Sequence, residues 1–183
     1  MIRYLLPVLV GMLSVSAAGT AHSVGRPSAP AIEPAFFEHL EKFHGHTCAG
    51  SLMGARLGFA AKLALKAAGG DGRLKAKYSS HSCPVDGIQF AAGTTYGNKA
   101  IEAVDQNEHR LLLTAEKSGR QVEARLTKGA EGKGKKFREL KGKATALPVG
   151  SAERQRLEKS VEDLLAWFRT APDVEVVHVR VMR

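Results

Sequence analysis

Cysteine is scarce in this chain of 183 residues, which has only Cys48 and Cys83. The two do not form a CxxC pair and no cysteine follows Cys83, which excludes zinc-finger modules built from closely spaced cysteines. The sequence also has no HExxH segment, which excludes the helical motif of zinc proteases. A metal site in this chain would therefore combine ligands from separate segments.

Aromatic residues make up only 6% of the sequence, and no basic strand is interleaved with them. Proteins that read single-stranded nucleic acid stack the bases on aromatic side chains. We therefore expect no nucleic-acid partner, although the formal net charge is +9 at pH 7. A charge of this size favours anionic partners, including small anionic ligands.

Only one long apolar run is present, at residues 5–15, and it is too short for a bilayer span of about 20 residues. It follows Arg3 and precedes small residues, which is the pattern of a secretory signal peptide. We predict a signal peptide over residues 1–21, cleaved after Ala21 or, as the second choice, after Ala18; an uncleaved anchor is the other interpretation. The mature protein is then expected to be periplasmic or secreted, without stable membrane insertion.

The remaining sequence divides into a linker and one domain. Three prolines among serine and alanine predict a flexible linker over residues 22–34, followed by a single domain over residues 35–183. Within the domain, residues 128–143 hold seven basic residues, two acidic residues and four glycines, which predicts a mobile basic loop. Such a loop is either a solvated surface or a flap over an anionic ligand.

Hydrophobic periodicity predicts an α+β fold, with helices packed on a mostly antiparallel sheet. Apolar residues at helical spacing indicate the helices, and alternating patterns indicate strands, two of which form a hairpin. The expected helices are at residues 33–43, 51–68, 84–92 and from Ser151 onward, and the expected strands are at 74–80, 110–115, 121–127 and 174–182.

Three glycines interrupt the start of the second expected helix at a spacing of four residues. Gly50, Gly54 and Gly58 would lie on one helix face, although glycine within a helix costs up to about 1 kcal/mol relative to alanine. Close approach of another backbone is the usual reason for such a face. The approaching backbone belongs either to the same chain or to a second copy, so a homodimer is left open.

Two segments are rich in metal-ligating side chains. His44, His46 and Cys48 lie within five residues, immediately before a predicted helix, and Cys83 is followed closely by Asp86. Imidazole and thiolate are ligands that soft transition metals prefer. A thiolate at a helix N-terminus is also stabilised by the free N–H groups and the helix dipole, which would lower the pKa of Cys48.

The residues alone leave three interpretations of the cysteine pair. A disulfide between Cys48 and Cys83 would close a loop of moderate length and stabilise the fold by about 4 kcal/mol in the chain-entropy model. A shared metal site is equally compatible with the pattern, and two unpaired, inert cysteines are the third interpretation.

These two segments resemble a known family. Residues 44–50 read HGHTCAG and residues 83–89 read CPVDGIQ, which is similar to the two motifs of the FmdE-like family, named after a component of formylmethanofuran dehydrogenase. The resemblance spans residues 36–126. It implies an α+β core with a metal-binding cleft lined by histidine, cysteine, aspartate and threonine.

Matching positions carry roles over from that family to this chain. The implied metal is a transition metal ion, with zinc as the first choice, and an open fourth position would admit water or a small anion. If the site is catalytic, Cys48 is the candidate nucleophile and Asp86 the candidate base. The implied metal ligands are His46, Cys48 and Cys83, and the implied neighbouring, cofactor-binding residues are His44, Gln89 and Thr95.

The chain also departs from the family pattern. Ala49 replaces a proline, and Thr94 replaces a cysteine, which puts any chemistry that needs a cysteine pair in that later loop in doubt. An exported protein would not meet the cytoplasmic cofactor for which the family is named, so that activity is not transferred. We expect an exported metal-binding protein; the alternatives are a non-catalytic carrier for a periplasmic redox system and a disulfide-stabilised structural module.

Overall fold

The computed structural model describes residues 32–182 of the chain. The predicted signal peptide, over residues 1–21, and most of the predicted linker, over residues 22–34, lie outside the described residues. Within the described part, none of the helices combines the length and the apolar character that a membrane span requires.

Two helices open the described chain and meet at a short, sharp connection. Helix α1 (Pro34–His44) begins with proline, whose fixed φ suits the first turn of a helix. It ends at Gly45, which adopts a φ of 89°, a left-handed conformation that glycine tolerates best. Helix α2 (Ala49–Ala67) starts only four residues later, with Cys48 as its N-cap.

The sheet has five strands in the order β2-β1-β3-β4-β5, and only the β1–β2 pair is parallel. Helices packed on this mostly antiparallel sheet confirm the predicted α+β class. The short strand β2 was missed by sequence reasoning because it offers too few residues for a visible alternation. The strands are β1 (Leu74–Tyr78), β2 (Ile101–Ala103), β3 (Arg110–Ala115), β4 (Gln121–Leu126) and β5 (Val177–Val181).

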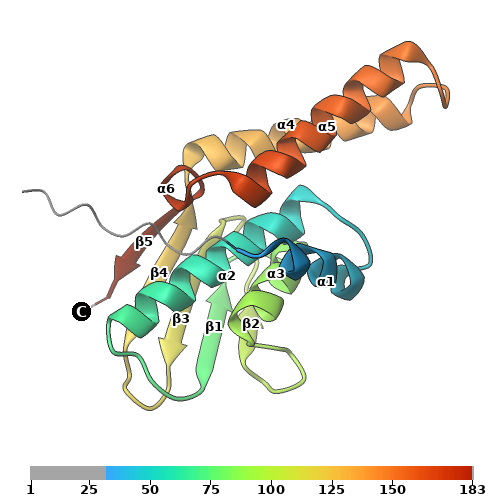
Figure 1. Cartoon of the computed structure of the whole chain (residues 1–183). Helices are drawn as coiled ribbons and strands as arrows, with labels where there is room; N and C mark the ends of the chain where they lie inside the picture. The colour runs from blue at the N-terminus through green and yellow to red at the C-terminus, as the bar shows by residue number, and fades with distance from the viewer. Residues whose placement is uncertain (1–31, 183) are drawn as a thin grey trace, which may run out of the picture.

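Alternation along β3 shows how the core forms. Leu111, Leu113 and Ala115 are fully buried, whereas the residues between them are half-buried on the open face. Helix α2 lies across β3, β4 and β5 and covers these side chains (Figure 1). Burying each leucine contributes about 1.5–3 kcal/mol, so the α2–sheet contact is the main source of stability.

Helix α3 (Pro84–Ala92) packs against the glycine face of α2 at backbone-to-backbone distance. A Cβ atom on Gly54 would lie 2.0 Å from the Pro84 carbonyl oxygen, and one on Gly87 would lie 2.1 Å from the Ser51 carbonyl oxygen. Neither position has room for any side chain. The close approach predicted from the glycine spacing therefore occurs within this chain, and it brings the two ligand-rich segments together.

The predicted mobile loop over residues 128–143 is wrong, because this segment forms helix α4 (Lys128–Thr145). Thr127 caps the helix by accepting a hydrogen bond from the Ala130 amide at 3.0 Å. Ala130, Gly134, Phe137 and Ala144 are buried along one face, so tertiary packing overrides the unfavourable helix propensity of the four glycines.

Helix α5 (Ala152–Thr170) forms a hairpin with α4 that extends away from the sheet (Figure 1). Its predicted cap is confirmed: the Ser151 hydroxyl accepts a hydrogen bond from the Arg154 amide at 3.3 Å. The predicted closing strand starts later than expected, since helix α6 (Asp173–Val176) precedes β5.

Arg56 anchors the base of this hairpin to α2. Its guanidinium is buried and donates to the carbonyl oxygens of Phe168, at 2.9 Å, and Ala171, at 2.5 Å. It also pairs with Asp173 at 2.7 Å. Breaking a buried pair of this kind typically costs about 3–5 kcal/mol, so Arg56 acts as a structural residue.

Candidate metal site

The turn between α1 and α2 places three ligand-rich side chains at one point. One ligand atom from each of His44, His46 and Cys48 lies within 4.8 Å of the other two. The His44 Nε2 atom is 3.5 Å from the Cys48 sulfur, and the rings of His44 and His46 have centroids 4.6 Å apart. Because Gly45 reverses the chain, residues from the end of one helix and the start of the next face the same space.

Cys48 is held at the N-terminus of α2 as its cap. Its sulfur accepts a hydrogen bond from the Ser51 amide at 3.3 Å. Burial raises the pKa of the Cys48 thiol, but the Ser51 amide and hydroxyl, together with His44 and Cys83, outweigh burial and lower the pKa below its usual value. The fold therefore favours the thiolate, which is the form that binds metals.

Asp86 on α3 fixes the orientation of His44. The His44 Nδ1 atom lies 2.6 Å from an Asp86 carboxylate oxygen, and the His44 side chain is only 7% exposed. Burial alone lowers the pKa of His44, but the hydrogen bond to Asp86 and the neighbouring Cys48 raise it overall. With Nδ1 donating to a carboxylate, Nε2 is left as the ligand atom facing Cys48.

Asp86 is supported in turn by the end of α3 and the loop after it. The Gln89 side-chain amide donates to the other Asp86 oxygen at 3.2 Å. The Tyr96 backbone amide donates to the Gln89 oxygen at 2.7 Å. A chain of hydrogen bonds thus runs from this loop through both sequence motifs to His44.

Cys83 stands next to this cluster, and both cysteines are free thiols. A Cβ atom on Gly50 would lie 2.7 Å from the Cys83 Cβ and 3.5 Å from the Cys48 sulfur, so only glycine allows the two segments to approach. Partial burial and the adjacent Cys48 raise the pKa of Cys83, because a second thiolate here would face a like charge.

The cluster opens onto a cavity of about 200 Å³ that has two unlike walls. Cys48 and Cys83 line one wall, together with His46. Helix α4 and the residue before β3 supply the other wall through Phe137, Arg138 and His109. The remaining lining residues are Ala49, Gly50, Met53, Ser82, Pro84 and Gly134.

Comparison with known proteins agrees with this site. A sequence model of the family described as "FmdE, Molybdenum formylmethanofuran dehydrogenase operon" matches residues 43–178. This chain belongs to the FmdE family. The matched region contains the described ligand cluster, the sheet and the α4–α5 hairpin.

A solved structure supports the same fold for this FmdE-family chain. An FmdE-like protein of tungsten formylmethanofuran dehydrogenase, from Syntrophus aciditrophicus, is 17% identical, with a TM-score of 0.52. The alignment covers 81% of this chain and 71% of that protein. No curated protein matches the chain in sequence.

The structure distributes the predicted site residues unevenly in this FmdE-family chain. His46, Cys48 and Cys83, the predicted ligands, line one cavity, and His44 joins them at the ligand cluster. The predicted base and its neighbour, residues 86 and 89, lie behind His44 rather than on the cavity. Thr95 is not among the cavity-lining residues; its backbone carbonyl accepts from the Ala100 amide at 3.1 Å.

Sequence reasoning missed two residues of the cavity. His109 has no ligand-type neighbour in sequence and was interpreted as surface or structural. Arg138 was assigned to the predicted loop, where its direction could not be inferred. The alternation of Arg110–Ala115 did predict a strand, but nothing in it indicated that the preceding histidine faces the cysteines.

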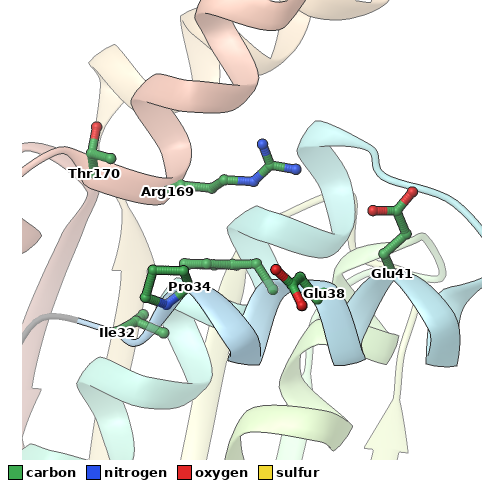
Figure 2. Close-up of a pocket in the computed structure, with 7 residues that line it drawn as sticks. Ile32, Pro34, Glu38, Glu41, Arg169 and Thr170 are labelled. Carbon is green, nitrogen blue, oxygen red and sulfur yellow. The ribbon is translucent and has the colours of Figure 1, made fainter.

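A second cavity, of about 370 Å³, lies between α1 and α5 and is larger than the one at the cysteines (Figure 2). Arg169 extends from α5 above α1, where Glu38 and Glu41 stand (Figure 2). This cavity contains no histidine and no cysteine. Its size does not make it the metal site, because the ligands that a soft metal prefers are all at the smaller cavity.

Proposed function

We propose that this FmdE-family chain is an exported metal-binding protein that holds a zinc-like ion with His44, His46 and Cys48, with Cys83 beside them. One observation carries the proposal: three ligand atoms of the kinds that zinc prefers lie within 4.8 Å of one another. The donor set fits a divalent ion of borderline softness, because it combines neutral imidazoles with a stabilised thiolate.

The surrounding hydrogen bonds match those of metal sites. Histidine ligands usually donate their second N–H to a carboxylate, which fixes the ring and its tautomer. His44 and Asp86 are arranged in this way, at 2.6 Å. We therefore assign Asp86 to orienting a ligand in preference to the role of general base.

The cavity gives the proposed ion an open side. Three or four protein ligands leave room for water or a small anion in a catalytic or carrier site, whereas purely structural zinc sites are closed. A zinc ion there would supply positive charge and polarise an oxygen atom of a bound molecule. The cavity wall that carries Arg138 is also compatible with an anionic occupant.

Export to an oxidising compartment makes the two cysteines informative. The secretory pattern over residues 1–21 supports this location. Both thiols are free and each affects the pKa of the other, so a bound ion would protect them from oxidation. The alternative function, a carrier for a periplasmic redox system, uses the same two thiols and differs in lacking turnover.

Metal content and free thiols test the proposal on the mature chain produced from residue 22 onward. One equivalent of zinc by elemental analysis, with both thiols unreactive until the ion is chelated, is the expected result. In cobalt-substituted protein, we expect a thiolate-to-metal charge-transfer band that disappears in Cys48→Ala.

A histidine pair provides the matched control for this test. His46→Ala should lower zinc affinity by more than the roughly 10–100-fold typical of losing an outer partner. His39→Ala removes an exposed histidine on α1 and should leave affinity unchanged. A Cys48–Cys83 disulfide in the purified protein, or zinc binding that survives Cys48→Ala, would refute the proposed site.

A further inference from the structure

We infer that His109 and Arg138 form an anion-recognition wall that selects a small carboxylate with a short apolar chain as the ligand of this cavity. The inference rests on the proposed function for the opposite, metal-binding wall. It concerns residues that lie outside both sequence motifs and adds a substrate class to the site.

The tautomer of His109 follows from its partner. Tyr78 is fully buried, and its hydroxyl lies 2.6 Å from His109 Nδ1. Within residues 32–182, the Tyr78 hydroxyl has no other hydrogen-bond partner. A buried hydroxyl proton needs an acceptor, so Tyr78 donates to Nδ1 and neutral His109 carries its own proton on Nε2.

The charge state of this pair is consistent with the same arrangement. Burial raises the pKa of Tyr78 far above neutrality, so its hydroxyl remains a donor. Burial also lowers the pKa of His109; Glu131 opposes this shift, and Arg138 and Lys135 reinforce it, so that the pKa stays below its usual value. His109 is therefore neutral near pH 7 and offers a single N–H to the cavity that it lines.

Arg138 supplies the charge that His109 lacks. It lines the cavity from α4 and forms no ion pair with any residue of the described chain. Helix α4 as a whole has seven basic residues and only two acidic ones. A guanidinium with a free fork of N–H donors, next to a neutral N–H donor, matches a carboxylate group.

The rest of the cavity limits the ligand's size and character. Met53 and Phe137 line it together with alanine, glycine and proline. Its volume of about 200 Å³ lies below the usual range for drug-sized ligands, which starts near 300 Å³. A carboxylate with about two to four carbons fits both the apolar lining and this volume.

Calorimetric titration with butyrate tests the inference, with butyramide as the uncharged probe of similar shape. The zinc-loaded protein should bind butyrate and should bind butyramide at least about tenfold more weakly. Arg138→Gln should weaken butyrate binding about tenfold or more, as expected for a lost charge-assisted contact. Lys141→Gln removes the same charge from α4 outside this cavity and should change binding less than twofold.

The outcomes separate this inference from the proposed function. Zinc binding without butyrate binding, or equal losses in Arg138→Gln and Lys141→Gln, overturns the anion wall and leaves the metal site standing. Absent zinc binding refutes the proposed function; butyrate binding by the metal-free protein, with the same contrast between the two variants, would still support the wall. Nitrogen NMR of the unmodified protein gives an independent check, because a proton on His109 Nδ1 overturns the inference without any variant.

Discussion

The two walls of the cavity use glycine for opposite purposes. On the α2–α3 wall, Gly54 and Gly87 allow two helix backbones to touch, and neither has room for a Cβ atom. On the α4 wall, Gly132 and Gly142 have no neighbouring atom within 4 Å of the position that a Cβ would take. The first pair is required by packing, whereas the second pair only lowers the stability of its helix.

This difference matches what each wall holds. Metal ligands need fixed geometry, and the α2–α3 contact fixes the cysteine segments to a backbone that cannot shift. The α4 wall packs through one buried face, with Gly134 against the Met53 side chain and Phe137 buried nearby. A rigid wall for the ion thus faces a more adaptable wall for the ligand.

The largest effect should come from filling the α2–α3 contact. Gly54→Ala would place a methyl group 2.0 Å from the Pro84 carbonyl oxygen, which is backbone and cannot rotate away. We expect a loss of about 3 kcal/mol or more in the free energy of unfolding, at the upper end for overpacking, together with loss of zinc binding. Chemical denaturation and metal analysis measure both. Wild-type stability in this variant would mean that the two helices are not held at backbone contact.

A smaller effect is expected from loosening one ligand while the rigid wall stays intact. Asp86→Asn keeps the size of the side chain but removes the charge that holds His44 Nδ1. Zinc affinity should fall about 10–100-fold, with little change in unfolding free energy. Competition with a chromogenic chelator measures the affinity, and Glu38→Gln, on α1, is the matched control. Unchanged affinity would remove Asp86 from the support of the site.

The two walls should also differ in how their histidines titrate in the metal-free protein. The pKa of His44 is raised, so its stabilising contribution is complete below the unfolded pKa of about 6.5 and is lost as pH rises through the folded value. The pKa of His109 is lowered, so its contribution is present above about 6.5 and is lost as pH falls toward the folded value.

NMR titration of the two imidazoles measures these opposite shifts directly. Replacing His109 with Gln should remove the loss of stability on acidification that this residue causes. Titration of both rings at the ordinary histidine value would show that the two walls do not differ electrostatically.

The smallest effect is expected where α4 has open space. Gly132→Ala adds a methyl group with nothing within 4 Å and should raise the free energy of unfolding by about 0.5–1 kcal/mol. Thermal unfolding should show a correspondingly small increase in melting temperature, with zinc binding unchanged. A destabilised Gly132→Ala protein would mean that α4 needs the freedom of glycine, contrary to the difference between the walls.

By itself, the sequence determined the features that depend on local pattern. Apolar periodicity predicted the helices before and after the first motif, the hairpin of β3 and β4, and the α+β class. The spacing of Gly50, Gly54 and Gly58 predicted a close backbone approach, because few other reasons justify glycine inside a helix. The residue types at positions 44, 46, 48 and 83 predicted the kind of chemistry.

Only the tertiary structure decided how distant segments share the cavity. The helical state of α4 depends on Phe137 and Ala130 finding a buried surface, which local propensity in a lysine- and glycine-rich segment does not indicate. The pairing of His44 with Asp86 and the placing of His109 and Arg138 opposite the cysteines likewise require α2, α3 and α4 to be packed. Side chains far apart in sequence acquire their partners only when the core has formed, so the ligand types were legible in the chain and their roles were not.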